Sequence, residues 1–427
     1  MNFALRAAYT SAGALAEWAA ALAPAGGSKT LASLAGRRGV LERFVRWGAT
    51  HRDPARPLVW LHAPSVGEGL QAQPVIELLR ARRPDVQVVY THFSSSAVPL
   101  AARIGADYAD FLPFDTTRGA RAALRAIRPT ALVFSKLDVW PVLVEEAVRQ
   151  QIRVAMISAT MAEGSGRRGL MARALLESAY ASLDAVGAID RADAERLVTL
   201  GVDRTRVQVT GDTRYDQVWA RASLADRSAP LIASLASSRP TLVAGSTWPG
   251  DERVLKDAWQ EVRRQLPLAR LIIAPHEVTP PHLTAIEEWA RRSALRCARL
   301  GAPDAPDADM VLVDRVGVLG DLYALADVAF VGGGFHAAGL HSVLEPAAFG
   351  VPVLIGPQYE KNGRDASLLI ATQGARSIEN ARQLAAALVT WLSTPSARAE
   401  AGARARSMVQ GGLGAAERSL ALVTALL

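Results

Sequence analysis

Short apolar runs alternate with helix-compatible segments along most of this 427-residue chain. Strands that are apolar throughout, each followed by a helix, are typical of a parallel sheet that helices cover on both faces. We therefore predict an α/β fold built from doubly wound parallel sheets. The predicted strands are Leu58–Leu61, Gln87–Tyr90, Ala131–Phe134, Val154–Ile157, Ala185–Ile189, Thr241–Ala244, Leu271–Ile273, Met310–Val313, Val328–Val331 and Val351–Ile355.

A polar stretch without a strand pattern interrupts this alternation after Gly211, and the pattern restarts at Thr241. With 50% hydrophobic residues, the chain has enough apolar material for two cores. We predict an N-terminal helix in residues 1–30, a first domain in 31–215 and a second in 216–427. The last helices could pack back on the first domain. Ligands of such sheets bind at the carboxyl ends of the strands, here across a cleft.

A strand, a glycine-rich turn, a helix and a second strand are expected between residues 327 and 357. The glycines Gly332–Gly334 precede a helical pattern over His341–Phe349. Glycine lets the backbone approach a ligand closely, and a helix N-terminus attracts anions. We expect an anionic ligand at this turn, with Glu345 accepting hydrogen bonds from sugar hydroxyls. A glycine run also fits an ordinary tight turn.

Two strand ends in the first half carry charged residues. Ser65 and Glu68 have the S-x-x-E spacing of a capping box, but the glutamate could instead be a cleft carboxylate that takes a proton from a hydroxyl. Lys136 and Asp138 follow the third predicted strand. They could recognise a charged substrate, or they could form a surface pair in which Asp138 caps the helix that begins near Pro141.

Two strand ends in the second half carry polar or cyclic residues: Ser246 and Thr247 follow one strand, and Pro275 and His276 follow the next. We expect His276 to form hydrogen bonds and His282 to face solvent. The two histidines have no third ligand at metal spacing, so no metal site is predicted.

The net charge of +7 comes almost entirely from arginine, because the chain contains only four lysines. Arginine suits phosphates and carboxylates. Aromatic residues make up only 6% of the chain and no nucleic-acid-binding motif is present, so anionic lipids or an anionic substrate are the expected partners, not nucleic acid. The single cysteine, Cys297, cannot form an internal disulfide; we expect it to pack, in a protein of a reducing compartment.

Residues 4–23 are helix-compatible, but Arg6 and Glu17 interrupt the apolar length that a membrane crossing needs. One half of the helical wheel is apolar and these charges lie on the other half, which predicts a helix lying in a membrane surface. An ordinary helix packed on the first domain fits the same pattern, and no cleaved signal is predicted. The apolar half consists of Leu5, Tyr9, Leu15, Trp18 and Leu22, and the basic residues that could meet anionic headgroups are Lys29, Arg37, Arg38, Arg43, Arg46, Arg52 and Arg56.

Seven motifs follow one another between about residues 57 and 370: HAPSVGE, KLDVWP, GDTRYD, GSTWPGDE, APHE, GVLGDLYALADVAFVGGGF and HSVLEPAAFGVPVLIGP. In order and spacing they resemble the 3-deoxy-D-manno-octulosonic acid (Kdo) transferases of lipopolysaccharide synthesis. That family begins with a short membrane-associated segment, which the N-terminal helix resembles.

The resemblance implies a GT-B fold, with an N-terminal domain for a lipid A precursor (lipid IVA) and a C-terminal domain for the donor CMP-Kdo. It also implies an inverting transfer of Kdo at the cytoplasmic face of the inner membrane of a Gram-negative-type bacterium, without a further cofactor. Glu68 matches the family's general base, and Ser65, Lys136 and Asp138 match the acceptor side. The residues that match the donor (CMP) side are Arg214, Ser246, Thr247, Pro275, His276, Gly317, Val318, Leu319, Gly333, Gly334, His341, Ser342, Val343, Leu344 and Glu345.

Five positions depart from the commonest pattern of that family. Ser342 stands in place of an asparagine, Val318 of a frequent glutamate, His276 of an arginine, and Lys136 and Asp138 of glutamates. The loop FHAAGLH is also longer than its most common form. Ser342 can still cap a helix and donate one hydrogen bond, so we expect donor binding to be altered in strength but not lost.

Two other classes of protein fit part of the pattern. Another GT-B enzyme of cell-envelope synthesis, such as a nucleotide-sugar glycosyltransferase or epimerase, would share the glycine turn and Glu345 but would not need HAPSVGE. A non-catalytic relative would bind the membrane or a partner enzyme. The joint presence of Glu68, Lys136 and Asp138 favours an enzyme.

Overall fold

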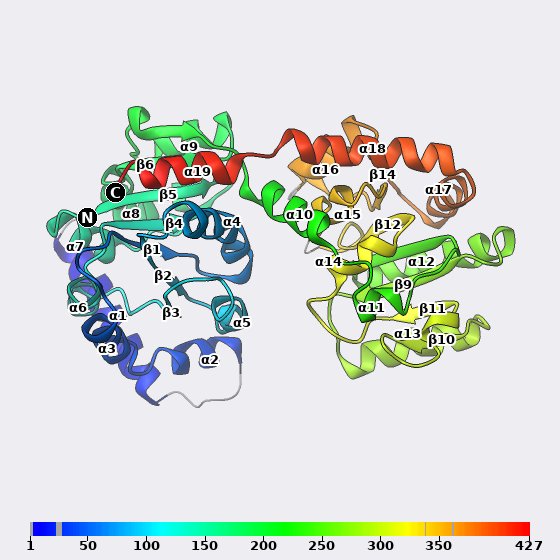
Figure 1. Ribbon diagram of the computed structural model, residues 1–427, viewed down its shortest axis with the longest axis horizontal. Coiled ribbons are helices and arrows are strands. Elements are labelled where there is room, and N and C mark those ends of the chain that lie inside the picture. The colour runs from blue at the N-terminus through cyan, green and yellow to red at the C-terminus, as the bar shows by residue number, and fades with distance from the viewer. Residues whose placement is uncertain (1–2, 23–27, 338, 361–362) are drawn as a thin grey trace. The chain divides into compact units, whose positions relative to one another are not determined.

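The computed structural model describes residues 3–22, 28–337, 339–360 and 363–427, which fold into two compact units (Figure 1). The first unit contains the described residues up to Gln217 together with Leu413–Leu427, and the second contains Val218–Gly412. Helix α10, Thr213–Leu224, carries the chain from the first unit into the second. The predicted boundary at residue 215 falls within this helix.

The first unit is built on a parallel sheet, which has seven strands in the described part of the chain. The strand order is β3-β2-β1-β4-β5-β6-β7, so the chain builds one side of the sheet from β1 and then crosses over to build the other, as in doubly wound folds. The strands are β1 Leu58–His62, β2 Gln87–His92, β3 Tyr108–Phe111, β4 Ala131–Ser135, β5 Arg153–Ala159, β6 Ala185–Ala188 and β7 Val207–Val209.

Helices cover both faces of this sheet (Figure 1). They are α1 Phe3–Leu22, α2 Lys29–Gly36, α3 Val40–Thr50, α4 Val66–Arg82, α5 Val98–Ala101, α6 Thr117–Ile127, α7 Pro141–Arg149, α8 Leu170–Ala181, α9 Arg191–Thr199 and α19 Ala415–Thr424. Successive residues of a strand point to opposite faces, so Leu58 and Trp60 of β1 face the core formed with α3, α6 and α7. Val59 and Leu61 face the core formed with α4, α5 and α19.

Helix α19 belongs to the first unit although it ends the chain. Its Leu420 packs in the core that α4 also lines. The carboxylate of Asp216 accepts hydrogen bonds from the backbone N–H groups of Gly414 and Ala416, at 2.8 and 2.9 Å, which satisfies donors at the start of this helix.

The second unit repeats the architecture on its own parallel sheet, again with seven strands in the described residues, in the order β10-β11-β9-β8-β12-β13-β14. The strands are β8 Thr241–Thr247, β9 Arg270–Pro275, β10 Cys297–Arg299, β11 Met310–Leu312, β12 Val328–Val331, β13 Val353–Ile355 and β14 Ala375–Ser377. The helices are α11 Pro230–Ala233, α12 Pro249–Gln265, α13 Pro280–Arg292, α14 Leu319–Leu322, α15 Leu344–Ala348, α16 Arg364–Ala371, α17 Ala381–Ser393 and α18 Pro395–Gly411. Leu242 and Ala244 of β8 face α12, α13 and α17, while Val243 faces α11 and α14.

The ten predicted strands are confirmed, and β3, β7, β10 and β14 are additional strands that the sequence pattern did not predict. The strand expected from Val351 begins only at Val353, because the backbone N–H of Val351 is bonded to the carbonyl of Pro346 in the preceding turn. Cys297 is half-buried in β10 and packs on the core of the second unit, as expected, and burial raises the pKa of its thiol to about 11.

Helix α1 packs on the first unit, the second of the two interpretations that the sequence left open. Its Tyr9 side chain donates a hydrogen bond of 2.8 Å to Asp115, and Arg6 forms an ion pair of 2.7 Å with Glu145, so the helix is fixed to the first unit. Leu15, Trp18 and Leu22 nevertheless remain 67–68% exposed. Tyr9 therefore does not share a free apolar face with them. Residue 23, the predicted end of the segment, lies outside the described residues. None of the helices in the described ranges is long and apolar enough to span a membrane.

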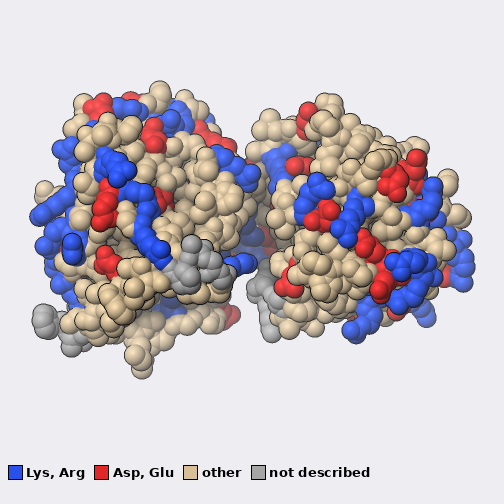
Figure 2. Space-filling model, turned by 90° about the horizontal axis from the view of Figure 1, so that it is seen from below, with Lys and Arg blue, Asp and Glu red and all other residues tan. Residues whose placement is uncertain are grey.

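Several of the basic residues that follow α1 are bound within the protein, which corrects the expectation that all could meet headgroups. Arg37 is buried, Arg43 forms an ion pair of 2.7 Å with Asp110, and the Arg52 guanidinium donates to the carbonyl of Ile127 at 2.7 Å. Lys29, Arg38 and Arg46 are exposed. Figure 2 shows the first unit from below, where Lys and Arg cover more of the surface than Asp and Glu.

Candidate functional site

Glu68 lies in the first turn of α4, just after strand β1 of the first unit. The hydroxyl of Ser65 donates to one of its carboxylate oxygens, and Nζ of Lys136 lies 3.2 Å from the other. Ser65 occupies the N-cap position, but its side chain accepts no hydrogen bond from the helix backbone. The capping-box interpretation is therefore wrong in its geometry: the serine orients the carboxylate and does not cap the helix.

Lys136 reaches Glu68 from the loop after β4, the strand that pairs with β1. Its backbone has φ of +76°, a left-handed conformation that is unusual for a residue with a Cβ. Its N–H is held by the carbonyl of Ile157 at 2.9 Å. Local backbone strain of this kind persists where the surroundings enforce it, and it occurs often at functional sites.

Asp138 is not part of this pair. It forms an ion pair with Arg167, and the helix that follows has Trp140 at its N-cap without a side-chain hydrogen bond. The expectation that Asp138 caps this helix is wrong. Two residues of the loop after β4 thus have different partners: Lys136 contacts the candidate base, and Asp138 contacts Arg167.

A buried aromatic side chain, Tyr90, lies within electrostatic reach of Glu68. The hydroxyl of Tyr90 is buried without a hydrogen-bond partner among the described residues; burial raises its pKa, and the charge of Glu68 raises it further. Nearby, the indole N–H of Trp140 donates to Nε2 of His62 at 3.0 Å. Burial lowers the pKa of His62 to about 3, so this ring is neutral and orients Trp140.

The predicted donor residues of the second unit lie at the carboxyl ends of β8 and β9 and in the segments that follow β9, β11 and β12. Thr247 is buried and its hydroxyl donates to Glu252 at 3.0 Å, while Ser246 before it has φ of +54°. Pro275 ends β9, and the backbone N–H of His276 donates to the carbonyl of Thr247 at 2.9 Å. The imidazole of His276 is exposed and stacks on other rings, as described below.

The glycine turn after β12 is held by a carboxylate of the protein itself. Asp251 accepts hydrogen bonds from the N–H groups of Gly333 and Phe335, at 2.7 and 2.9 Å. Gly333 has φ of +94°, and a Cβ on Gly334 would lie 2.5 Å from the backbone of Gly356. These glycines are required by backbone conformation and close packing. Asp251 occupies the place at this turn where we had expected an anionic ligand.

The helix after this turn is shorter than predicted. It covers Leu344–Ala348 and not His341–Phe349, and its N-cap is Val343, so Ser342 does not cap it. Pro346 explains the late start, because a proline without an N–H is tolerated only in the first turn of a helix. Ser342 is exposed, whereas Val343 and Leu344 are buried.

Glu345 is half-buried in the first turn of this helix. No hydrogen-bond donor among the described residues reaches its carboxylate. Burial raises the pKa of Glu345, the positive charge of Arg221 lowers it, and Asp321 raises it. Arg221 itself pairs with Asp321 at 3.0 Å and contacts the carbonyl of Gly317 at 3.4 Å.

Arg221 therefore links the predicted turn Gly317–Leu319 to Glu345: its side chain contacts Gly317, and its charge acts on the Glu345 carboxylate. Gly317 has φ of +89°, and Val318 precedes the short helix α14. Arg214, which was also predicted on the donor side, belongs to the first unit. It forms an ion pair of 2.6 Å with Asp212.

Comparisons with known proteins decide the family. A family model described as 3-Deoxy-D-manno-octulosonic-acid transferase (kdotransferase) matches residues 38–217. The 3-deoxy-D-manno-octulosonic acid transferase of Bordetella pertussis is 30% identical over 393 residues, 88% of this chain and 89% of that protein. The chain belongs to the Kdo transferase family. The enzyme of the same name from Haemophilus influenzae is 23% identical over 91% of both chains.

Membership of the Kdo transferase family makes the chain a glycosyltransferase. Its GT-B fold is also seen in distant solved structures. A UDP-GlcNAc 2-epimerase from Neisseria meningitidis bound to UDP-GlcNAc has a TM-score of 0.62 at 13% identity, covering 86% of this chain and 100% of that one. A putative UDP-N-acetylglucosamine 2-epimerase from Listeria monocytogenes has a TM-score of 0.62 at 15% identity, covering 87% and 96%. At these identities the likeness concerns the fold alone.

This Kdo transferase has a ring stack at the strand ends of its second unit that sequence reasoning missed. The ring of Trp248 stacks on histidines of two loops. Its centroid lies 4.2 Å from that of His336, which follows β12, and 4.5 Å from that of His276, which follows β9. Its indole N–H donates to Nε2 of His341 at 3.1 Å. Burial lowers the pKa of His341, and the neighbouring His276 lowers it further. An aromatic residue directly after Thr247 was the available signal.

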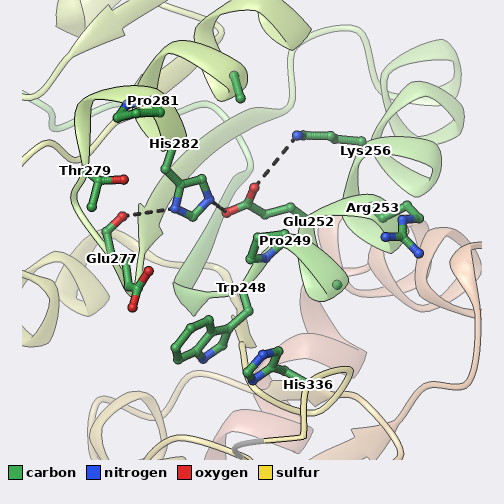
Figure 3. A pocket seen from close by; sticks show the side chains of 12 residues that line it. Trp248, Pro249, Glu252, Arg253, Lys256, Glu277, Thr279, Pro281, His282 and His336 are labelled. Carbon is green, nitrogen blue, oxygen red and sulfur yellow. Dashed lines mark hydrogen bonds and ion pairs between the residues drawn. The ribbon is translucent and has the colours of Figure 1, made fainter.

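An open pocket of about 810 Å³ adjoins this stack (Figure 3). Trp248 and His336 form one side of it, and Glu252, Lys256 and His282 lie on the other. His282 does not face solvent, which corrects the prediction. Its ring nitrogens lie 2.8 Å from a carboxylate oxygen of Glu252 and 3.0 Å from the carbonyl of Glu277. No group of three His, Cys, Asp or Glu residues within the described ranges is arranged to hold a metal.

Proposed function

We propose that this Kdo transferase moves Kdo from CMP-Kdo to a hydroxyl of a lipid A precursor, lipid IVA, with inversion and with Glu68 as general base. The observation that carries the proposal is the position of the Glu68 carboxylate. It lies at the carboxyl edge of the first sheet, oriented by Ser65 and by the ammonium of Lys136 at 3.2 Å. Carboxylates positioned in this way serve as proton acceptors for hydroxyl nucleophiles.

In the proposed step, the acceptor oxygen attacks the anomeric carbon of Kdo while its proton passes to Glu68. The bond between that carbon and the phosphate oxygen of CMP breaks, and CMP leaves with the electron pair. The donor would lie against the loops that carry His276, Val318 and Glu345. Glu345 has no hydrogen-bond donor among the described residues, which leaves its oxygens able to accept the ribose hydroxyls of CMP.

The acceptor would be reached at the cytoplasmic face of the inner membrane. Two features of the first unit support a contact with a membrane. Leu15, Trp18 and Leu22 are exposed on α1, and the face of the first unit that is seen from below is rich in Lys and Arg (Figure 2). An apolar helix face next to basic residues is suited to an anionic membrane surface.

The test is direct transfer. Purified protein is incubated with CMP-Kdo and lipid IVA, and the lipid is weighed by mass spectrometry while release of CMP is measured in the same sample. We expect the lipid to gain the mass of one Kdo residue for each CMP released beyond hydrolysis. A folded protein that binds CMP yet leaves the mass of the lipid unchanged would contradict the proposal.

A further inference from the structure

Arg37 is a buried arginine of the first unit. Its side chain is 6% exposed, and its Nε and Nη2 atoms are buried without a hydrogen bond to any of the described residues. Its guanidinium lies over the ring of Phe93, 3.6 Å from the centroid, and 5.2 Å from that of Phe114. Burial lowers the pKa of Arg37 to about 10, so the side chain is still charged at neutral pH.

A small pocket of about 220 Å³ opens beside this guanidinium. Two cationic residues and three hydroxyl residues line it, without a carboxylate among the lining residues. They are Lys29, Thr30, Ser33, Arg37 and Ser94, together with Leu34 and Phe93. On its other side Arg37 lines a second pocket that includes Glu17 and Glu42, but neither carboxylate accepts a hydrogen bond from it. The lining of the small pocket thus offers two cations and three hydroxyls, which suits an anion.

The small pocket lies next to the turn that carries Glu68. The backbone N–H groups of Phe93 and Ser94 donate to the carbonyl of Pro64, at 3.0 and 2.9 Å, and Pro64 immediately precedes Ser65. The ring of Phe93 also stacks on Trp140, 5.5 Å between centroids, in the loop that begins with Lys136. A ligand that fills the pocket would therefore extend toward the candidate base.

We propose that Arg37 and Lys29 bind a phosphate group carried by the lipid acceptor, and that this contact places the acceptor hydroxyl at Glu68. A buried charge without a partner is unfavourable in the free protein, and a phosphate supplies the charge and the several acceptor oxygens that a guanidinium fork matches. The hydroxyls of Thr30 and Ser94 can donate to the remaining oxygens. This inference rests on the proposed function, because it takes the acceptor to be a phosphorylated glycolipid.

The main test is Arg37→Met, which removes the charge and retains an unbranched side chain that can pack on Phe93. The variant should unfold at the same temperature as the wild type or a higher one, because it no longer buries an unpaired charge. Its KM for phosphorylated lipid IVA should rise about ten- to a hundredfold, with kcat nearly unchanged. On the same lipid after enzymatic removal of its phosphates, variant and wild type should have equal KM values.

Lys29→Ala provides a second variant that cannot fail by misfolding, because Lys29 is exposed. It should also lose part of the preference for the phosphorylated lipid. Arg46→Ala removes an exposed arginine of α3 that does not line the pocket, and this variant should behave as the wild type. The proposal is overturned if Arg37→Met and Lys29→Ala keep the wild-type preference, or if they weaken both acceptors by the same factor.

Two further measurements separate the possible sources of the phosphate. Binding to phosphatidylglycerol vesicles without acceptor should be equal for wild type and Arg37→Met; a loss in the variant alone would assign the site to membrane headgroups and overturn the proposal. Inorganic phosphate should raise the melting temperature of the wild type less than phosphorylated lipid IVA does at equal concentration. A larger effect of the free ion would assign the pocket to it and likewise overturn the proposal.

Failure of the proposed function can be distinguished from failure of the phosphate site. In that case the wild type would transfer Kdo to neither form of the lipid. Binding of the two forms, measured by calorimetry without donor, would then decide the phosphate site alone: the wild type should prefer the phosphorylated form at least about tenfold, and Arg37→Met should lose this preference. Equal binding of both forms by the wild type would overturn the site.

Discussion

Nζ of Lys136 lies 3.2 Å from Oε1 of Glu68, although 68 residues separate them in the chain. The contact exists because β1 and β4 are neighbours in the first sheet and both residues follow the ends of these strands. The remaining carboxylate oxygen is bound by the hydroxyl of Ser65. Glu68 is thus oriented by two side chains and by its place in the first turn of α4.

Glu68→Gln separates a base from a structural residue. Glutamine keeps the size and can still bond to Ser65, so we expect near-normal stability and CMP affinity. Turnover should fall by about 10²–10⁴-fold, the usual contribution of a positioned general base. Single-turnover transfer to lipid IVA measures this, with calorimetry of CMP binding as the control. Transfer within a few-fold of wild type would rule out Glu68 as the base, and Asp138 would then be tested.

Glu345→Ala should weaken CMP binding about ten- to a hundredfold, because charge-assisted hydrogen bonds from ribose hydroxyls contribute about 1.5–3 kcal/mol each. Calorimetry with the folded variant measures the change. Unaltered CMP affinity would leave Glu345 as a packing residue of α15.

Glu345→Gln tests, without any ligand, whether the charge of Glu345 lowers the free energy of unfolding. Burial raises the pKa of Glu345, so the folded protein binds its proton more tightly than the unfolded chain. Stability from this group is therefore present at low pH and is lost as pH rises through the folded-state pKa. At pH 7 the glutamine variant should have the higher free energy of unfolding, and the difference should vanish below the unfolded-state pKa. A less stable glutamine variant at pH 7 would contradict the burial of the charge.

The inner strands of both sheets could be predicted because they are apolar on both faces. The four strands that were missed are all sheet edges, and all four carry polar or charged residues, as in Val207–Val209 and Ala375–Ser377. Edge strands in natural proteins are short and often charged, which removes the apolar signal on which the prediction depends. Their pairing is visible only once the neighbouring strand is in place.

Only those residues of the candidate site that directly follow a strand could be predicted from the sequence. Glu68 and Lys136 follow strands that pair, so their contact follows from the topology. The roles of Asp138 and His282 depended instead on Arg167 and Glu252, which lie elsewhere in the chain, and no local pattern indicates such partners. Asp251 was missed for the same reason: its bonds to the glycine turn join residues 82 and 84 positions apart.

The exposed apolar residues of α1 predict a membrane contact. Replacing Leu15, Trp18 and Leu22 together by serine should lower the affinity for anionic vesicles at least about tenfold, since the insertion of even part of each side chain contributes favourable burial. Stability should be unchanged because all three are 67–68% exposed. Vesicle co-sedimentation measures the effect. High salt should weaken the wild type too, because screening acts over about 8 Å at physiological ionic strength.

A matched control for this prediction is available in the second unit. Leu224, Leu268 and Val316 are 70–82% exposed. Their triple replacement by serine removes a similar amount of exposed apolar surface and should leave vesicle binding unchanged. Equal losses in the two triple variants would show that general hydrophobicity, and not α1, determines binding.

Asp309 predicts a pH dependence of stability. Burial alone would raise its pKa, but hydrogen bonds from Arg296 and Arg239, with the charge of Arg263, lower the pKa of Asp309 to about 2. A lowered pKa means that the folded protein gains stability above the unfolded-state value near 4 and loses it as pH falls toward 2. Asp309→Asn should therefore lower the free energy of unfolding by about 1–2 kcal/mol at pH 7, and this difference should shrink as pH falls from 4 to 2.

Urea unfolding followed by tryptophan fluorescence at several pH values measures this difference. Asp257→Asn is the control, because Asp257 is exposed on α12 and should show no pH-dependent change. A constant difference between wild type and Asp309→Asn from pH 7 to pH 2 would mean that lost packing, and not the charge of Asp309, causes the destabilisation.

Lys136→Gly separates the backbone of Lys136 from its ammonium group. At φ of +76° a residue with a Cβ is strained, and glycine is not, so the variant should be more stable by about 0.5–1 kcal/mol. Its turnover should nevertheless fall at least about tenfold, because Glu68 loses a charge-assisted hydrogen bond that holds it in place. Gln151→Gly is the matched control: Gln151 is exposed, has φ of +58° and should gain similar stability at full activity. Full turnover in a stabilised Lys136→Gly would show that the ammonium does not position Glu68, and that the strained loop has another cause.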